Sequence, residues 1–218
     1  MVVPTRDFID ALRGADSATV ANAVEGLGAR GRTQGYADLR LRCLVAQPRP
    51  MVGYAVTVRI DSTSPGGVPD NSRFGELLAA VGRSPKPCVV VCQEAGPAPE
   101  KGCHMGDVVG TRLSRLGAVG VVSGSGIRDL PGIRAAGLTA FALGTVVAHG
   151  VWTITAVGRP AEVAGLRIRP GDLLHGNEDG LLTVPASRPD ELLRLIDEVR
   201  LREARARSAA SPGAGIAH

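Results

Sequence analysis

The chain has 218 residues, a length that suits one domain with appended ends. Hydrophobic residues make up 44% of it, enough for a core, but aromatic residues make up only 3%, so Val, Leu, Ile and Ala must build that core. The net charge of +4 is mild, and the late arginines have no aromatic partners, which is typical of a solvated helix face and excludes a nucleic-acid surface from our expectations.

The N-terminal residues and the cysteines also point away from two classes of protein. Residues 1–10 have neither the basic nor the apolar region of a signal peptide, and no apolar run approaches the roughly 18 residues of a membrane span. We therefore predict a cytoplasmic protein that does not bind a membrane. The cysteines form no CxxC pair, and we interpret them as reduced thiols in or near the core, without a zinc site: Cys43, Cys88, Cys92 and Cys103.

Hydrophobic periodicity and chain breakers divide the first half of the chain into short elements. Asp16 or Ser17 can cap the second helix, and β-branched residues mark 53–60 as a strand. The apolar run after Pro87 is typical of a strand covered on both faces. In chain order we predict a helix at 8–12, a helix at 18–27, an irregular segment at 29–50, a strand at 53–60, a loop at 61–70, a helix at 71–81, a strand at 87–93 and a loop at 94–105.

A helix and a returning strand form the centre of the chain. The helix begins at Asp107 and ends at Gly117, and the apolar residues 118–122 predict a buried strand after it. A turn of Gly and Ser follows, and then the pair Arg128-Asp129. A helix with a strand running back brings both ends of the unit to one edge of a sheet, where open α/β sheets bind ligands.

Strands with short turns follow in the second half, and a long helix ends it. In order we predict strands at 138–143, 152–157 and 166–168, tight turns at 170–172 and 177–180, a strand at 181–184, a helix from 187 or 189 to about 206, and a disordered tail at 209–218. Because strands and helices alternate only in the middle, the fold class is α/β with a mixed sheet rather than a regular doubly wound one. Residues 1–208 form one domain in this prediction.

Asp107, Arg128 and Asp129 each have an ordinary structural explanation when taken alone. Asp107 can cap its helix, and Arg128 and Asp129 can form a surface ion pair. Together at one sheet edge they indicate chemistry: a helix N-terminus binds carboxylate or phosphate, a lone aspartate with water ligands suits Mg²⁺, and an adjacent arginine can hold an oxyanion.

Other motifs in the chain carry less information. Gly124-Ser125-Gly126 lacks the third glycine and the helix of a dinucleotide fingerprint, and no serine lies in a G-x-S-x-G elbow. His104 is either a catalytic base or a solvated loop histidine, and we favour the loop histidine. His149 and His175 are weaker candidates still.

The spacing of Asp107, twenty intervening residues and Arg128-Asp129 resembles the D-x20-R-D signature of the RraA-like family, which includes the class II 4-hydroxy-4-methyl-2-oxoglutarate (4-carboxy-4-hydroxy-2-oxoadipate) aldolases. Five further segments agree, in order: GYAVTV, FGELLAAV, GAVGVVSGSGIRD, LRIRPGDLL and NEDGLLTVP. The resemblance covers roughly residues 15 to 200. It implies an α/β/β sandwich similar to swivelling phosphohistidine domains, with N-terminal helices, a C-terminal helix and assembly as a homotrimer or homohexamer.

The same resemblance implies roles for individual residues in a site for a small 2-oxo acid. Asp129 would hold Mg²⁺ or Mn²⁺, partly through water, and Arg128 would bind the keto oxygen and steady an enolate. Asp107 would orient a water for proton transfer. Gly106 and the backbone N–H groups of Val108 and Val109 would complete the substrate-binding set by holding the carboxylate.

The implied activity is metal-dependent carbon–carbon cleavage that yields pyruvate through a metal-stabilised enolate, with oxaloacetate decarboxylation through the same enolate as a second reaction. Two other functions stay open. One is a non-catalytic regulator that binds an RNA-degrading endonuclease, and the other is a lyase for a different oxo acid. The segments 96–105 and 149–160 depart from the family pattern and are expected to flank the site, so the sequence leaves the substrate open.

Overall fold

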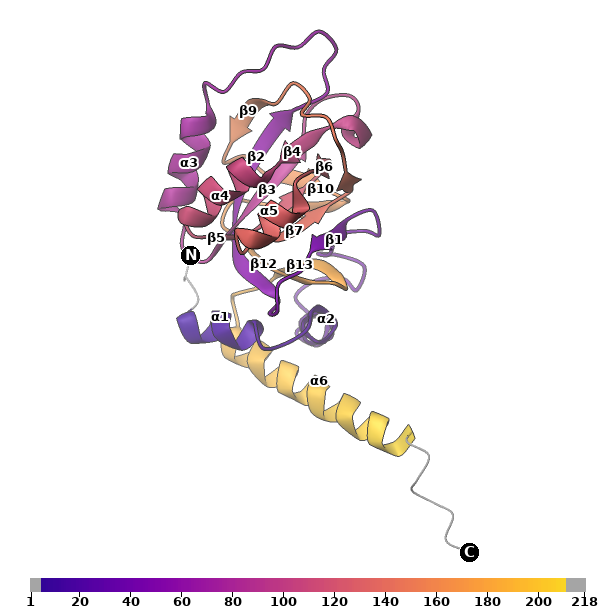
Figure 1. Ribbon diagram of the computed structural model, residues 1–218. Helices are drawn as coiled ribbons and strands as arrows, with labels where there is room; N and C mark the ends of the chain where they lie inside the picture. Colours follow the sequence, from indigo (N-terminus) through magenta and orange to yellow (C-terminus); the bar gives the residue numbers. More distant parts are fainter. Residues whose placement is uncertain (1–4, 211–218) are drawn as a thin grey trace, which may run out of the picture.

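Residues 5–210, the part of the chain that the computed structural model describes, contain an eight-stranded mixed sheet with the strand order β1-β7-β5-β3-β2-β12-β13, and β9 pairs with β2 (Figure 1). The four strands β2, β3, β5 and β7 are parallel to one another, and the other pairings are antiparallel. The strands are β1 (Arg42–Val45), β2 (Met51–Asp61), β3 (Cys88–Glu94), β5 (Ala118–Ser123), β7 (Thr139–Ala142), β9 (Thr153–Val157), β12 (Leu173–Asn177) and β13 (Gly180–Val184). The predicted α/β class with a mixed sheet is confirmed.

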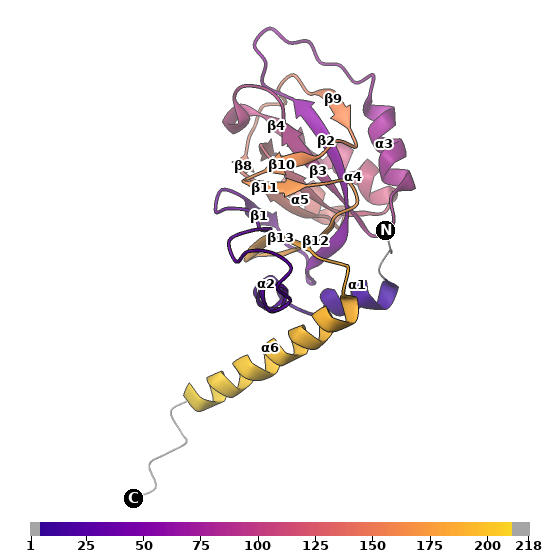
Figure 2. The same ribbon diagram turned by 180° about the vertical axis from the view of Figure 1, so that it is seen from behind.

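Different layers cover the two faces of the sheet. The helices α3 (Phe74–Arg83), α4 (Asp107–Arg115) and α5 (Leu130–Ala135) cover the face toward the viewer in Figure 1. A hairpin of β10 (Ala161–Val163) and β11 (Leu166–Ile168) covers the opposite face (Figure 2). Each layer has its own apolar cluster against the sheet, so the central strands are buried on both sides as their continuous apolar runs predict.

A third cluster joins three helices to one end of the sheet. α1 (Arg6–Leu12), α2 (Ser17–Gly26) and α6 (Pro189–Ala210) pack against β2, β12 and β13. Asp16 caps α2 through a 2.8 Å hydrogen bond from the Thr19 N–H to its Oδ1. Beyond this cluster α6 leads away from the body of the molecule (Figure 1). No helix within residues 5–210 combines the length and the apolar character that crossing a bilayer requires.

A second, three-stranded sheet lies at the ends of the parallel strands. It consists of β4 (Cys103–Met105), β6 (Gly126–Ile127) and β8 (Gly144–Thr145), all parallel. Each of these strands follows one of the central strands β3, β5 and β7 in the sequence. The chain therefore passes from the main sheet into the small sheet three times, each time after the carboxyl end of a parallel strand. The candidate site lies at these three connections.

The structure corrects the sequence prediction mainly at short elements. The segment predicted as irregular contains β1, and the predicted loop at 94–105 contains a 3₁₀ turn (Pro99–Lys101) and β4. The strands β6, β8, β10 and β12 and the helix α5 were not predicted, because two to six residues are too few to show a period. α6 runs to Ala210, so the first two residues of the predicted tail are helical, and the rest of that tail lies outside the described residues.

Candidate active site

The ladder between β4 and β6 brings the two halves of the sequence motif together. Cys103 pairs with Gly126 and Met105 with Ile127, and the Arg128 N–H donates to the Met105 carbonyl over 2.9 Å. The residues that directly follow β4 and β6 therefore lie side by side at the end of the small sheet. This is the meeting of the helix start with the Arg-Asp pair that the sequence predicts.

The first turn of α4 presents unpaired backbone donors at this point. Gly106 is its N-cap in extended conformation (φ −134°, ψ −175°) and supplies no side-chain cap. The Gly110 N–H, bonded to the Gly106 carbonyl over 3.0 Å, is the first intrahelical donor. The N–H groups of Asp107, Val108 and Val109 precede it and have no partner within the helix, so at the positive end of the helix dipole they are available to bind an anion.

Arg128 and Asp129 face this turn, and their charged groups form only a weak ion pair with each other. Arg128 Nε lies 3.4 Å from Asp129 Oδ2, longer than a good charged hydrogen bond, and the two side chains are 36% and 43% exposed. Asp129 has left-handed backbone angles (φ 58°, ψ 41°) and is the N-cap of α5 without a side-chain cap bond. Such a conformation in a non-glycine residue is uncommon and concentrates at functional sites.

Two glycines make the close approach possible. A Cβ on Gly106 would lie 2.7 Å from Asp129 Oδ2, and a Cβ on Gly132 would lie 2.4 Å from the Cβ of Asp107. The starts of α4 and α5 are thus packed together, and the two carboxylates belong to one cluster.

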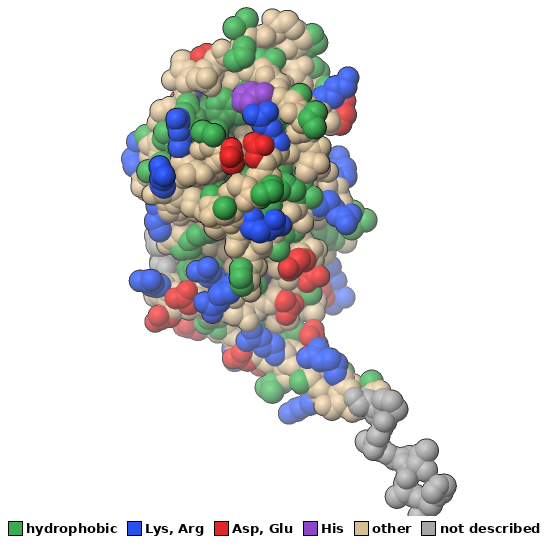
Figure 3. Space-filling view, viewed as in Figure 1, with side chains coloured by type: hydrophobic (Ala, Val, Ile, Leu, Met, Phe, Trp, Pro, Cys, Tyr) green, Lys and Arg blue, Asp and Glu red, His purple; other side chains and the backbone are tan. Residues whose placement is uncertain are grey.

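The cluster lines a hollow of about 70 Å³ that reaches from β4 to the segment before β9. Its walls include all six residues of the predicted site: Gly106, Asp107, Val108, Val109, Arg128 and Asp129. His149 and Trp152, together with the β4 residues Cys103, His104 and Met105, complete them. Figure 3 shows acidic, basic and histidine side chains gathered on this face. The structure thus brings the predicted set together, while the role of each residue stays a prediction.

Trp152 closes one wall in a constrained position. Its φ of 55° is unusual for a bulky residue, and its indole Nε1 donates to the His104 carbonyl over 3.0 Å. The carbonyl of Val147, five residues earlier in the chain, lies 3.5 Å from Arg128 Nη1. The segment 149–160, which departs from the family pattern and was expected to flank the site, therefore supplies His149 and Trp152 to its walls.

His104 is not the solvated loop histidine that we expected. It is fully buried in the middle of β4, with its Nδ1 2.9 Å from Ser123 Oγ and its Nε2 3.0 Å from Glu94 Oε2. The expectation failed because β4 is only three residues long and gives no periodic signal. Glu94 was read only as a loop charge, although it is the last residue of a buried strand.

Burial alone would raise the pKa of Glu94, but hydrogen bonds outweigh it. The carboxylate accepts from His104, from the Ser62 hydroxyl and N–H, and from the Gly96 N–H. Together they lower its pKa from 4.5 to about 2, so the group is ionised at neutral pH. An ionised carboxylate only accepts, so His104 Nε2 carries a proton and donates.

The donor set of the cluster suits a hard cation with water ligands. Among the described residues no group of three or more His, Cys, Asp or Glu side chains could enclose a metal ion, which argues against a zinc-type centre. A single exposed carboxylate in a polar turn is compatible with Mg²⁺ or Mn²⁺, because Mg²⁺ keeps several waters and binds through one or two carboxylates. Asp129 fits that requirement.

The four cysteines are free thiols in the structure, as predicted. Burial raises the pKa of the Cys92 thiol to about 12 and that of Cys43 to about 11. Burial also raises the pKa of Cys103, which borders the hollow. These thiols stay protonated at neutral pH and are poor nucleophiles.

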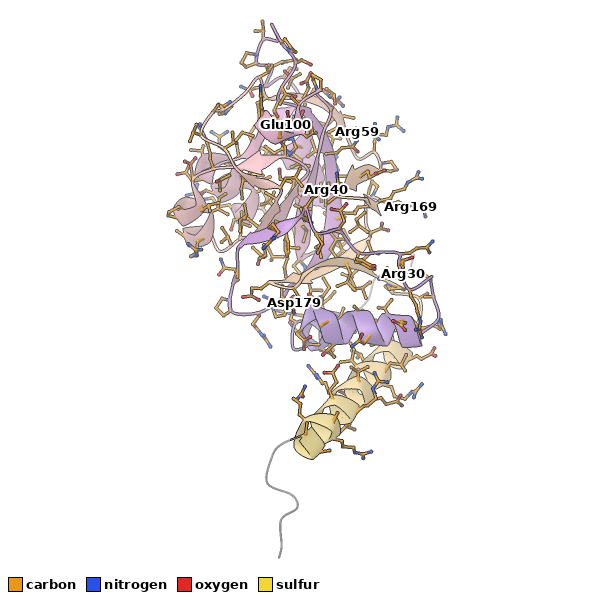
Figure 4. All side chains as sticks on the ribbon, turned by 90° about the vertical axis from the view of Figure 1, so that its right-hand side faces the viewer. Arg30, Arg40, Arg59, Glu100, Arg169 and Asp179 are labelled. Atoms are coloured by element: carbon orange, nitrogen blue, oxygen red, sulfur yellow. The ribbon has the colours of Figure 1, made fainter. Side chains whose placement is uncertain are left out.

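Several other arginines are bound within the fold. Figure 4 shows Arg30, Arg40 and Arg59 along one side of the molecule. Arg30 donates to Thr183, Arg40 is paired with Asp38, and Arg59 donates to the Pro160 carbonyl over 2.8 Å. Arg128 differs from these three because its own polar contacts are long, 3.4 Å to Asp129 Oδ2 and 3.5 Å to the Val147 carbonyl.

Comparisons with known proteins agree with this picture. The family model described as RraA-like, Aldolase/RraA, matches residues 7–183. Protein DlpA of Legionella pneumophila is 23% identical over 96% of this chain, and a Halalkalibacterium halodurans protein named "Putative 4-hydroxy-4-methyl-2-oxoglutarate aldolase" is 33% identical over 41% of it. The matched parts amount to 32% and 43% of the lengths of these two relatives.

Two solved structures share the fold along nearly the whole chain. Streptomyces coelicolor RraAS2, described as an unusual member of the RNase ES inhibitor RraA protein family, has a TM-score of 0.74 and 24% identity over 95% of this chain and 98% of its own. An uncharacterized protein from Pseudomonas syringae pv. tomato has a TM-score of 0.74 and 21% identity over 99% of this chain and 97% of its own. At these identities the likeness concerns the fold alone.

Proposed function

The chain belongs to the RraA-like family, and from this premise we propose that it is a divalent-metal-dependent pyruvate aldolase. Its substrate would be a 2-oxo acid of the 4-hydroxy-4-methyl-2-oxoglutarate type. One observation carries the proposal: backbone donors at a helix start, a loosely engaged guanidinium and two carboxylates line the same small hollow. The aldolase named among its relatives supports the same reaction class.

The first turn of α4 and Arg128 would bind the reacting end of the substrate. The carboxylate of a 2-oxo acid fits the N–H groups of Val108 and Val109, which lack intrahelical partners. Arg128 would then donate to the keto oxygen, where negative charge grows as the bond beyond the next carbon breaks. A fixed cation at that oxygen stabilises the transition state more than the ground state.

Asp129 would hold Mg²⁺ or Mn²⁺ next to this oxygen. When bound, a divalent ion supplies positive charge that polarises the keto group. Arg128 is adjacent to Asp129 in the chain and lies within 3.4 Å of its carboxylate, so the residues proposed for both positive charges are neighbours.

Asp107 would orient a water molecule that transfers protons during the reaction. Cleavage between carbons 3 and 4 turns the 4-hydroxyl into a carbonyl and releases its proton, and the electron pair moves into the enolate of pyruvate. That enolate then takes a proton at carbon 3. Asp107 is exposed beside the hollow and can orient a water for either transfer. Loss of CO₂ from oxaloacetate gives the same enolate, so this site would serve a decarboxylation as well.

A lactate-dehydrogenase-coupled pyruvate assay tests the proposal on a panel of 4-hydroxy-2-oxo acids and oxaloacetate, with Mg²⁺, with Mn²⁺ and with a chelator. We expect pyruvate release that depends on the metal. Absence of pyruvate from every substrate would reject the aldolase. Retained binding of an RNA-degrading endonuclease in a pull-down would then favour a regulator, and cleavage of another oxo acid would favour a different lyase.

The assembly of the chain is part of the same proposal. We infer a homotrimer or homohexamer, since a hollow of about 70 Å³ is small beside typical ligand pockets and a neighbouring copy could enclose it further. Light scattering after size-exclusion chromatography measures the mass directly, and a monomer at assay concentrations would reject this inference.

A further inference from the structure

We propose that Glu94 and His104 are positioning residues, which hold β4 and through it the start of α4 in register with Arg128 and Asp129. The activity that they support is the one proposed above, so one arm of the test rests on that function and a second arm does not. Neither residue was assigned a role by the sequence motif.

The first argument is that a buried hydrogen-bonded chain joins β4 to three strands of the main sheet. His104 contacts Ser123 at the end of β5 and Glu94 at the end of β3, over 2.9 and 3.0 Å. The carboxylate of Glu94, only 3% exposed, also accepts from the N–H of Ser62, the first residue after β2, over 2.9 Å. A three-residue strand is thus fixed at its centre.

The second argument is that the chain of bonds is complete. Because His104 Nε2 donates to the ionised carboxylate, Nδ1 can accept from the Ser123 hydroxyl, which also faces the Gly126 carbonyl over 3.3 Å. Ser123 Oγ in turn accepts from the Ser125 N–H over 3.2 Å. Fully satisfied buried networks of this kind rigidify the elements that they join.

The third argument excludes direct chemistry by Ser123. The order serine, histidine and carboxylate is that of a nucleophilic triad. However, Ser123 is fully buried and does not line the hollow, whereas His104 does. A nucleophile must reach its substrate, so the network acts on the site only through His104 and the backbone.

The fourth argument traces that path. The His104 carbonyl accepts from Trp152 Nε1, which forms one wall of the hollow. The next residue, Met105, accepts from the Arg128 N–H, and Asp107 begins α4 two residues later. A displaced His104 therefore moves a wall, the helix start and the arginine strand together.

Three variants test the proposal, with a matched control far from the site. His104→Gln keeps a donor for Glu94 and loses the ring, while Glu94→Ala removes the acceptor. Glu94→Gln is the conservative variant, because its amide can donate to Nε2 if the ring proton moves to Nδ1. His175→Gln is the control, since His175 is equally buried but bonded to Ser17 and to the carbonyls of Leu12 and Ala15.

In the pyruvate assay we expect His104→Gln and Glu94→Ala to lower kcat by about 10- to 100-fold, the effect of a misplacement near 1 Å. Their KM should stay within about threefold, because the residues do not touch the substrate. Glu94→Gln should recover most of kcat, and His175→Gln should leave kcat unchanged. Equal kcat for all four variants, or an equal loss in the His175→Gln control, would overturn the positioning role.

Hydrogen exchange supplies the arm that does not depend on catalysis. In the folded variants, measured below their melting temperatures, we expect His104→Gln and Glu94→Ala to speed exchange at 103–109 and 126–130, and His175→Gln to speed it near α1 and α2 instead. If the wild-type protein showed no turnover, the proposed function would be rejected. The hydrogen-exchange pattern would still test the positioning role of Glu94 and His104. Unchanged exchange at 103–109 in both site variants would overturn it.

Discussion

Two ends of the molecule each contain a buried histidine, and the pair invites comparison. His104 lies in β4 beside the candidate site, and His175 lies in β12 beneath the N-terminal helices. Both are fully buried, and both have a serine hydroxyl at Nδ1, from Ser123 at 2.9 Å and from Ser17 at 3.0 Å. Burial and the first partner are thus the same.

The two histidines differ at Nε2. His104 faces the ionised carboxylate of Glu94, whereas His175 faces the carbonyl oxygens of Leu12 and Ala15 at 3.0 and 3.1 Å. Burial lowers the pKa of His175 despite these two bonds, so its ring is neutral at pH 7. His175 joins the corner between α1 and α2 to the sheet. His104 joins the charged Glu94 network to the hollow of the candidate site. A buried histidine therefore takes its role from its second partner and from what lies beside it.

The largest effect that we expect follows from changes at the candidate site, and it is a loss of turnover without a loss of stability. Asp129→Ala should abolish metal-dependent turnover, and Arg128→Ala should lower it by about 100- to 1,000-fold, or about 2.7–4 kcal/mol of barrier. Both side chains are more than one-third exposed, so the free energy of unfolding should change by less than about 0.5 kcal/mol. The measurements are the coupled pyruvate assay and urea unfolding.

Arg30→Ala is the matched control for Arg128→Ala. Arg30 is half-buried at the helix end and donates to the Thr183 carbonyl and hydroxyl over 2.8 and 2.7 Å. Its loss should cost about 1–3 kcal/mol of stability and leave turnover intact. A reversed pattern, in which Arg128→Ala unfolds the protein and Arg30→Ala inactivates it, would place the site elsewhere.

Acid unfolding should separate the two networks by pH. The pKa of Glu94 is lowered from 4.5 to about 2, so the carboxylate contributes stability above pH 4.5 that is lost as the pH falls toward 2, on the order of 3 kcal/mol in all. His175 has a pKa lowered from 6.5 by burial, so the folded state binds fewer protons than the unfolded one and stability declines as the pH falls below 6.5.

Single variants identify each part of that curve. Urea unfolding between pH 3 and 8 should show a shallower dependence of stability on pH below pH 4.5 in Glu94→Gln, and a shallower dependence near pH 6 in His175→Gln. If either variant flattened the other region instead, the assignment of the two networks to their pH ranges would be wrong.

His175→Ala should lower stability at neutral pH about as much as Arg30→Ala does. It leaves the Ser17 hydroxyl and two carbonyls without their buried partner, which costs about 1–3 kcal/mol. Turnover per folded molecule should not change. A drop in kcat at temperatures where circular dichroism shows an intact fold would mean that the two ends are coupled, and the contrast between them would weaken.

The sequence predicted elements with a long enough pattern and missed those without one. The run at Cys88–Cys92 and the unit from Asp107 to Ser123 were predicted because burial on two faces and helical period leave a clear signature. From that unit alone the meeting of Asp107 with Arg128 followed. The role of Glu94 did not, because its partners are Ser62, just after β2, and His104 in β4, and only the tertiary fold brings them together.

Only the part of the site that lies within one continuous stretch of sequence could be predicted, because the other part is brought in by the tertiary fold. The helix start and the Arg-Asp pair lie in one continuous stretch, and they were identified. The walls formed by His149 and Trp152 come from a segment about twenty residues farther along, which reaches the hollow through a left-handed residue and a tryptophan bond to β4. Neither feature leaves a pattern that periodicity or propensity can detect.

The smallest expected effects come from adding one methyl group at each end. Gly106 has extended backbone angles that alanine can adopt, but a Cβ there would lie 2.7 Å from Asp129 Oδ2. That oxygen is at the end of a side chain, so Gly106→Ala should displace the carboxylate without unfolding the protein. We expect Mn²⁺ affinity, followed by electron paramagnetic resonance, to fall by roughly tenfold, or about 1.4 kcal/mol.

Gly26→Ala is the corresponding change at the helix end. A Cβ on Gly26 would lie 3.5 Å from Leu195 Cδ2, an ordinary contact, and α2 would exchange a poor helix former for the best one. Stability should rise by about 0.5–1 kcal/mol in urea unfolding, and Mn²⁺ affinity should stay the same. The same methyl group would then weaken ligand binding where backbone and carboxylate meet, and strengthen packing where two helices meet. Equal Mn²⁺ affinity in both variants would show that Asp129 is not the metal ligand, or that its carboxylate has room to spare.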